Sequence, residues 1–135
     1  MNQRMSHFIV EALEHERSGV EIYRLALACA QDDELRDEFG RHLQQTRDHE
    51  SALLETCRDL GIDPELETPV RAVVRDTGEL LASSISKARA AGDPEVAELV
   101  ACETVVLAET QSLANWALLS QLASARGSRE VDRIH

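Results

Sequence analysis

The segment from Leu35 to Leu60 repeats one set of side chains at alternating steps of four and three, the spacing of one face of an α-helix. Strand signals are almost absent, because aromatic residues make up only 3% of the chain and β-branched residues do not alternate with polar ones. Ala, Leu, Glu and Arg, which favour helices, dominate instead. The sequence therefore predicts an all-α fold. The repeating face of this segment reads Leu35, Phe39, His42, Thr46, His49, Leu53, Cys57 and Leu60.

Turn-forming residues divide the chain into four helical segments. Asp33 is expected to cap the second helix, and Gly61 is expected to end it in the left-handed conformation. Asp93 is expected to cap the fourth helix, with Pro94 at its first position. The expected helices cover about 6–30, 34–60, 70–91 and 95–125.

Four amphipathic helices of this length predict a four-helix bundle over residues 1–127, followed by a flexible C-terminal tail over 128–135. The loop between the second and third helices can span at most about 30 Å. It therefore leaves two topologies open, a simple up-down bundle and one in which a crossover makes these helices parallel. The expected inward residues of the fourth helix are Val96, Leu99, Val100, Glu103, Leu107, Thr110, Ala114 and Ala117; those of the third are Val70, Val73, Val74, Leu81, Ile85 and Ala88.

The charge balance excludes two classes of partner. There are 14 Lys and Arg against 25 Asp and Glu, a net charge of −11, whereas nucleic acids and anionic membranes reward clustered positive charge. No apolar run approaches the roughly 18 to 20 residues of a membrane span, and no signal peptide is visible, so a cytoplasmic location is expected. The three scattered cysteines form no disulfide or metal pattern and are expected to be small buried hydrophobes.

His42, Thr46 and His49 interrupt the apolar face of the second helix. If the first two helices form an antiparallel hairpin, Glu16 faces Thr46 and lies at nearly the same level as His49. A buried carboxylate is costly unless it finds a metal ion, a histidine or a proton. We therefore expect Glu16 and His49 to be in contact inside the bundle, and His42 to be a hydrogen-bonded core residue.

Carboxylates and imidazoles from facing helices at one level are the usual components of metal sites in helical bundles, and such mixed oxygen and nitrogen sets suit iron or manganese. The fourth helix offers Glu103 on its expected inward face and Glu109 at the flank of that face. The third helix offers no clearly inward carboxylate. The candidate metal ligands are Glu16, His49, and Glu103 or Glu109.

Five short elements, in this order and spacing, resemble the ferritin-like superfamily, and within it the small bacterial stress-associated ferritin-like family of unknown biochemical role. This resemblance implies a left-handed crossover bundle, often dimeric, with a di-metal site in which the register points to Glu109. The chain departs from the family where Glu109-x-x-Ser112 replaces a Glu-x-x-Glu motif. The elements are Glu16, Asp33-Glu-Leu35, His42-Leu-x-x-Thr46, Gly92-Asp-Pro-Glu-Val96 and Glu109.

Two functions follow as expectations. The first is a ferritin-like bundle whose degenerate metal site is non-catalytic and which acts through a homodimer or another protein partner. Trp116 lies outside the expected inward face and would mark that contact surface. The alternative is an iron- or manganese-binding protein with weak ferroxidase or peroxide-detoxifying activity. No catalytic residues are predicted, because the chain carries neither a nucleophile elbow nor a glycine-rich phosphate loop.

Overall fold

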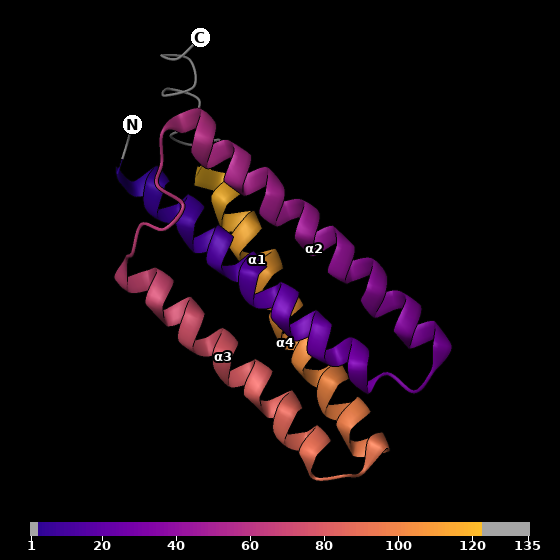
Figure 1. The fold of residues 1–135 in the computed structure, drawn as a ribbon. Helices are drawn as coiled ribbons and strands as arrows, with labels where there is room; N and C mark the ends of the chain where they lie inside the picture. Colours follow the sequence, from indigo (N-terminus) through magenta and orange to yellow (C-terminus); the bar gives the residue numbers. More distant parts are fainter. Residues whose placement is uncertain (1–2, 123–135) are drawn as a thin grey trace.

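The computed structural model describes residues 3–122, which form four α-helices and no strand (Figure 1). The all-α prediction is confirmed, and the predicted helix bounds that fall within this range agree within about three residues, whereas the predicted end of the fourth helix at 125 lies outside it. No helix in this range is long and apolar enough to cross a membrane. The predicted tail at 128–135 and the domain end at 127 lie outside the described residues. The helices are α1 (Gln3–Cys29), α2 (Asp33–Leu60), α3 (Pro69–Ala90) and α4 (Pro94–Leu122).

The helix ends follow the turn chemistry of the sequence. Asp32, one residue before the predicted Asp33, caps α2 by accepting a hydrogen bond of 3.0 Å from the backbone N–H two residues later. Gly61 ends α2 at φ 70°, a left-handed conformation that glycine adopts without strain. Asp93 caps α4 through a 3.1 Å bond of the same kind, as predicted.

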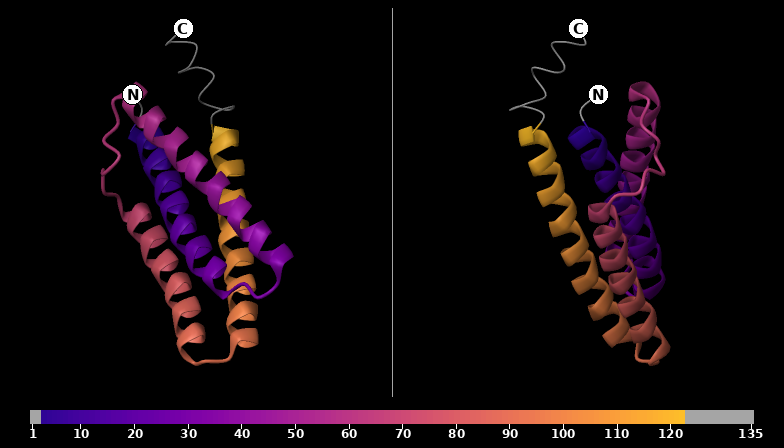
Figure 2. Two further views of the ribbon diagram at one scale, coloured as in Figure 1. Left: turned by 45° about the vertical axis from the view of Figure 1, so that its right-hand side comes forward. Right: turned by 90° about the vertical axis from the view of Figure 1, so that its left-hand side faces the viewer.

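Helix α1 lies between the other helices and packs against all three, while α3 also packs against α4 (Figure 2). Among the other helices, only α1 has a backbone that lies close to the backbone of α2. Helix α3 runs parallel to α1 and therefore antiparallel to α2, because Glu14 contacts Arg71, Ser18 lies against Gly78, and Ile22 and Ile85 share one core cluster further along both helices.

The crossover that we predicted between the second and third helices is therefore wrong. The loop after α2 stays at one end of the molecule, where Ile62 and Leu66 pack against the first turns of α1. Arg71, just inside α3, is bound to Glu14 of α1 and holds the start of α3 at the same end. The topology is a simple alternation of helix directions (Figure 1).

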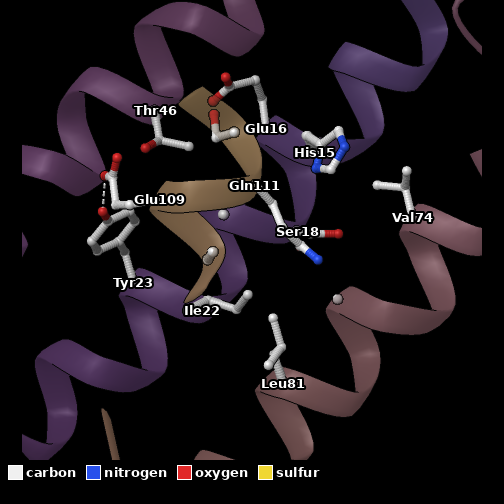
Figure 3. Close-up of a pocket in the computed structure, with 14 residues that line it drawn as sticks. His15, Glu16, Ser18, Ile22, Tyr23, Thr46, Val74, Leu81, Glu109 and Gln111 are labelled. Carbon is white, nitrogen blue, oxygen red and sulfur yellow. Dashed lines mark hydrogen bonds between the residues drawn. The ribbon is translucent and has the colours of Figure 1, made fainter. Parts of the chain in front are cut away.

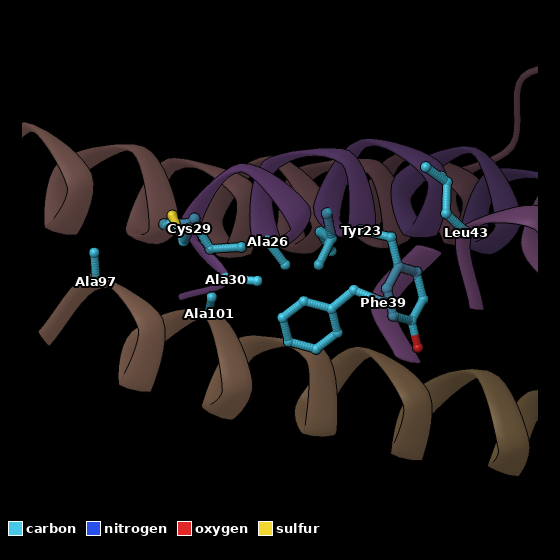
Figure 4. Packing of buried hydrophobic residues seen from close by; sticks show 10 residues of the cluster. Tyr23, Ala26, Cys29, Ala30, Phe39, Leu43, Ala97 and Ala101 are labelled. Atoms are coloured by element: carbon cyan, nitrogen blue, oxygen red, sulfur yellow. The ribbon is translucent and has the colours of Figure 1, made fainter. Parts of the chain in front are cut away.

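The core has two parts, one at each end of α1. One part lies at the α1–α2 turn and is shown in Figure 4, where small side chains of α4 face Phe39 and Ala30. The other part joins the first half of α1 to the end of α2 and the following loop, through Leu13, Leu53 and Cys57. Cys29 and Cys57 are buried and free, as predicted, and Cys102 is free and half-buried.

The inward face predicted for α4 is wrong. Leu99 is 69% exposed and Leu107 is 47% exposed, and Glu103 also lies on the surface. Helix α4 is apolar around most of its circumference, so periodicity does not decide which face is buried. Small side chains let α4 approach α1 closely, and these take the inward positions. The buried residues of α4 are Ala97, Ala101, Thr104 and Asn115.

The inward face of α3 is also partly different from the prediction. Val74 and Ile85 are buried as expected, but Val70 and Val73 are exposed. Gly78 takes the central inward position because the crossing with α1 is tight. A Cβ atom there would lie 2.3 Å from the Ser18 Oγ atom, so a larger residue would push the two helices apart.

Candidate functional site

Glu16 of α1 is the most deeply buried of the predicted ligands, at 3% exposure. Its Oε1 atom accepts a 2.9 Å hydrogen bond from the indole N–H of Trp116, and the His49 Nδ1 atom lies 3.6 Å from the same oxygen. Burial raises the pKa of the Glu16 carboxyl, although the Trp116 hydrogen bond and His49 oppose this shift. The predicted proximity of Glu16 and His49 is therefore present in the structure.

His49 does not lie inside the bundle, however. Its side chain is 57% exposed, and its ring lies at the edge of the Trp116 indole with centroids 6.0 Å apart. Trp116 itself is turned inward and packs against the core around Leu13, so the prediction that it marks an exposed surface is wrong. The reason is that α4 is rotated relative to the predicted face, which brings Trp116 over Glu16.

A second polar cluster lies nearer the α1–α2 turn. Tyr23 donates a hydrogen bond to Glu109 Oε1, and the His42 Nδ1 atom lies 3.1 Å from the same oxygen. The other ring nitrogen of His42 contacts Glu38 at 2.8 Å, which lowers the pKa of Glu38. Burial, followed by the bond to Glu109, raises the pKa of the Tyr23 hydroxyl. His42 is hydrogen-bonded, as predicted, but it is half-buried and does not lie in the core.

A small cavity lies between these clusters, with Glu16, Tyr23, Thr46 and Glu109 among its lining residues (Figure 3). Its volume is about 30 Å³. This volume accommodates on the order of two water molecules, and the polar lining supplies the hydrogen bonds that such waters need. The cavity is too small for an organic substrate, so the chemistry that it can support is hydrogen bonding to water.

The structure separates the two candidates on α4. Glu109 lines the cavity and contacts α1 and α2, in agreement with the family register. Glu103 is exposed on another side of α4 and forms no ion pair with the residues that the structure describes. The prediction that Glu103 lies on the inward face is wrong. In the up-down topology, the rotation of α4 brings Glu109, and not Glu103, to the level of Tyr23.

The donor set forms two separate carboxylate–imidazole pairs, Glu16 with His49 and Glu109 with His42. Within residues 3–122, no group of three or more His, Cys, Asp or Glu side chains is close enough to hold a metal ion. The carboxylates of Glu16 and Glu109 each already accept a hydrogen bond, one from Trp116 and the other from Tyr23. In this arrangement the residues do not fit an iron or manganese site.

Sequence reasoning missed a buried ion pair on the other side of α1. Arg71 is 1% exposed, and its Nε atom donates to Glu14 Oε1 at 2.8 Å. Its Nη1 atom donates to the carbonyl oxygens of Pro64 and Leu66 at 2.6 and 3.0 Å. Arg75 contacts the same Glu14 oxygen at 3.3 Å. The sequence carried one indication of this ion pair. Glu14 and Glu16 are two residues apart, so their carboxylates lie on different sides of α1.

Comparison of the chain with protein-family models, with curated proteins and with solved structures gives no match. The case for a function therefore depends on the geometry of the chain itself.

Proposed function

We propose that this chain is a non-catalytic helical bundle that acts in the cytoplasm by binding protein through the outer face of the α3–α4 hairpin. The observation that carries the proposal is the distribution of exposed apolar side chains. Within residues 3–122, every large hydrophobic residue that is exposed lies on α3 or α4. They are Val70, Val73, Leu80, Val96, Leu99, Val106, Leu107, Leu113 and Leu118.

The exposure of these residues supports the proposal. The nine residues are between 47% and 73% exposed and lie along two neighbouring helices. Exposed apolar side chains gathered on one part of a molecule mark protein–protein contact surfaces more often than singly scattered ones do. A hairpin that is apolar on both sides is expected when one side packs on its own core and the other on a partner.

The interior supports the same proposal, because Glu16 and Glu109, the candidate ligands that line the cavity, already accept hydrogen bonds from Trp116 and Tyr23. We propose that the ferritin-like resemblance reflects ancestry and that the ancestral metal site has been reduced to the Glu16 and Glu109 pairs. The antiparallel course of α2 and α3 does not support this ancestry, which therefore depends on the sequence register alone.

The alternative function, iron or manganese binding with weak ferroxidase or peroxide-detoxifying activity, has one observation in its favour. The carboxylates of the two pairs, Glu16 and Glu109, line the same small cavity. Elemental analysis after anaerobic addition of ferrous iron, on protein purified without a His-tag or chelator, tests this alternative. A stoichiometric metal that is lost in Glu16→Ala would establish it; metal-free protein is the expected result.

The proposed function is tested in extracts of cells that express the tagged chain at its natural level. The wild type is expected to run above the monomer mass on native size exclusion. A variant with Leu99→Gln and Val106→Gln is expected to run as a monomer, because two exposed apolar side chains at the centre of the face are replaced. Glu16→Gln, which changes the interior, serves as the matched control and should assemble normally. Equal elution of wild type and the Leu99/Val106 variant would overturn the proposal.

A further inference from the structure

The exposed side chains of α4 include one regular row that runs almost the whole length of the helix. Its members follow one another at alternating steps of three and four, the heptad spacing with which one helix packs against another. All of them are exposed, and Figure 2 shows α4 along one edge of the molecule, so none of the other described helices covers this row. We call it the α4 seam; it comprises Val96, Leu99, Glu103, Val106, Thr110, Leu113, Ala117 and Ser120.

Glu103 is the only charged member of the α4 seam, and no residue in the range 3–122 forms an ion pair with it. Two other glutamates of α4 differ in this respect. Glu98 accepts hydrogen bonds from backbone N–H groups of the α1–α2 turn, and Glu109 accepts one from Tyr23. A partner that covers the α4 seam removes water from Glu103, which is costly unless the carboxylate gains a counter-charge. The partner must therefore supply a cation at this point.

Thr110, the next polar member of the α4 seam, needs nothing from a partner. Its hydroxyl donates a 2.8 Å hydrogen bond to the backbone carbonyl oxygen of Val106 in the same helix. Covering Thr110 therefore leaves no hydroxyl donor unpaired. The α4 seam thus calls for apolar side chains along most of its length and for one positive charge facing Glu103.

We propose that the α4 seam binds an amphipathic α-helix of another protein, whose apolar face carries one Lys or Arg that pairs with Glu103. This inference rests on the proposed function and specifies the kind of partner. The α4 helix of a second copy does not supply this residue, because α4 contains no Lys or Arg over 94–122. The net charge of −11 also favours the approach of a cationic partner over an acidic one.

The experiment measures the binding of synthetic peptides to the purified full chain by fluorescence anisotropy. Each peptide is a labelled helix of about four heptads with Leu at the seam positions. The central seam position carries Lys in one peptide and Glu in its matched control. The Lys peptide is expected to bind the wild type roughly tenfold or more tightly than the Glu peptide, because the Glu peptide sets like charges against each other.

Two variants of the chain, checked for helical folding by circular dichroism, locate the binding. Glu103→Lys should reverse the preference, so that the Glu peptide binds more tightly than the Lys peptide. The variant with Leu99→Gln and Val106→Gln should lose binding of the Lys peptide, because both apolar contacts beside Glu103 are replaced.

Three results would overturn the inference. Failure of both peptides to bind would exclude a helical partner of this kind, and the extract experiment above would then still decide whether the face binds protein at all. Equal binding of the two peptides, or a preference that Glu103→Lys leaves unchanged, would show that Glu103 does not select the partner. A wild type that sediments as a dimer, and as a monomer in the Leu99/Val106 variant, would place a second copy on the α4 seam.

Discussion

The two hairpins of this molecule differ in whether their large apolar side chains are buried or exposed. In the α1–α2 hairpin the large hydrophobic side chains are buried or half-buried, and the exposed positions are polar, charged or small. In the α3–α4 hairpin small side chains such as Ala97 and Ala101 are buried, and larger ones such as Leu99 and Leu113 are exposed. Placing small residues inside and large residues outside is a poor solution for an isolated chain. The comparison indicates that the first hairpin makes the fold and the second presents a contact surface.

The largest effect is expected where the two hairpins are joined in the interior. Arg71→Ala removes the buried partner of Glu14 and two donors to loop carbonyls, and is expected to lower the free energy of unfolding by about 3–5 kcal/mol. Arg75→Ala is the matched control, because its side chain contacts the same Glu14 oxygen and is 34% exposed; it should cost about 1 kcal/mol or less. Urea denaturation measures both, and similar losses would contradict the importance of burial here.

The same substitution at two positions tests the contrast between the hairpins directly. Leu13→Ala, at 0% exposure, is expected to cost about 2–5 kcal/mol, because it leaves a cavity in the core. Leu113→Ala, at 73% exposure, should change the stability by about 0.5 kcal/mol or less in protein diluted until it is monomeric. Denaturation at low concentration checks both. A large loss for Leu113→Ala in the monomer would mean that the outer stripe belongs to the internal core.

Trp116→Phe tests the attachment of α4 over Glu16. An aromatic ring is kept, although phenyl is smaller than indole, and the indole N–H that donates to the buried carboxylate is lost, so we expect a destabilisation of about 1–3 kcal/mol. Tyr23→Phe, which removes the donor to the half-exposed Glu109, should have a smaller effect because water can replace it. Thermal unfolding of the two variants gives their order, and a larger loss for Tyr23→Phe would contradict the burial of Glu16.

The smallest expected effect concerns pH. The pKa of Glu16 is raised in the folded state, so its contribution to stability is fully present below the unfolded value and is lost as the pH rises through the folded value. As the pH rises above about 4.5, the ordinary pKa of a glutamate, the wild type should therefore lose stability relative to Glu16→Gln. Urea denaturation at a series of pH values from there upward measures the difference. A constant difference would show that the carboxyl titrates normally.

Much of the fold was predictable because α1 and α2 are amphipathic in the ordinary sense. Leu13 and Phe39 are buried where the spacing placed them, and the hairpin geometry correctly brought His49 to Glu16. Periodicity failed on α4, because apolar residues cover more than one of its faces and the closest packing needs alanine. The direction of α3 also could not be read from the loop length. It depends on the Arg71–Glu14 ion pair, which joins positions 57 residues apart.

The residues of the candidate site on α1 and α2 were predictable from helix periodicity, whereas those on α4 depend on how α4 packs. Glu16 was identified from α1 alone, but the partner that completes its hydrogen bonding, Trp116, lies 100 residues away on the helix whose rotation was wrong. Glu103 and Glu109 were both candidates because six residues separate them, and only the packing of α4 assigns one to the cavity and the other to the surface.

The central claim is that protein covers the outer face of α3–α4 in solution. Carbene footprinting of the full chain, read by mass spectrometry in dilute purified protein at about 1 μM and in extract of the cells that express it, tests it most directly, because partners are absent or dissociated only in the first sample. The account predicts that labelling at Leu80, Leu99, Val106 and Leu113 falls sharply in the extract, while labelling along α2 stays constant. Equal labelling of these four residues in both samples would contradict it.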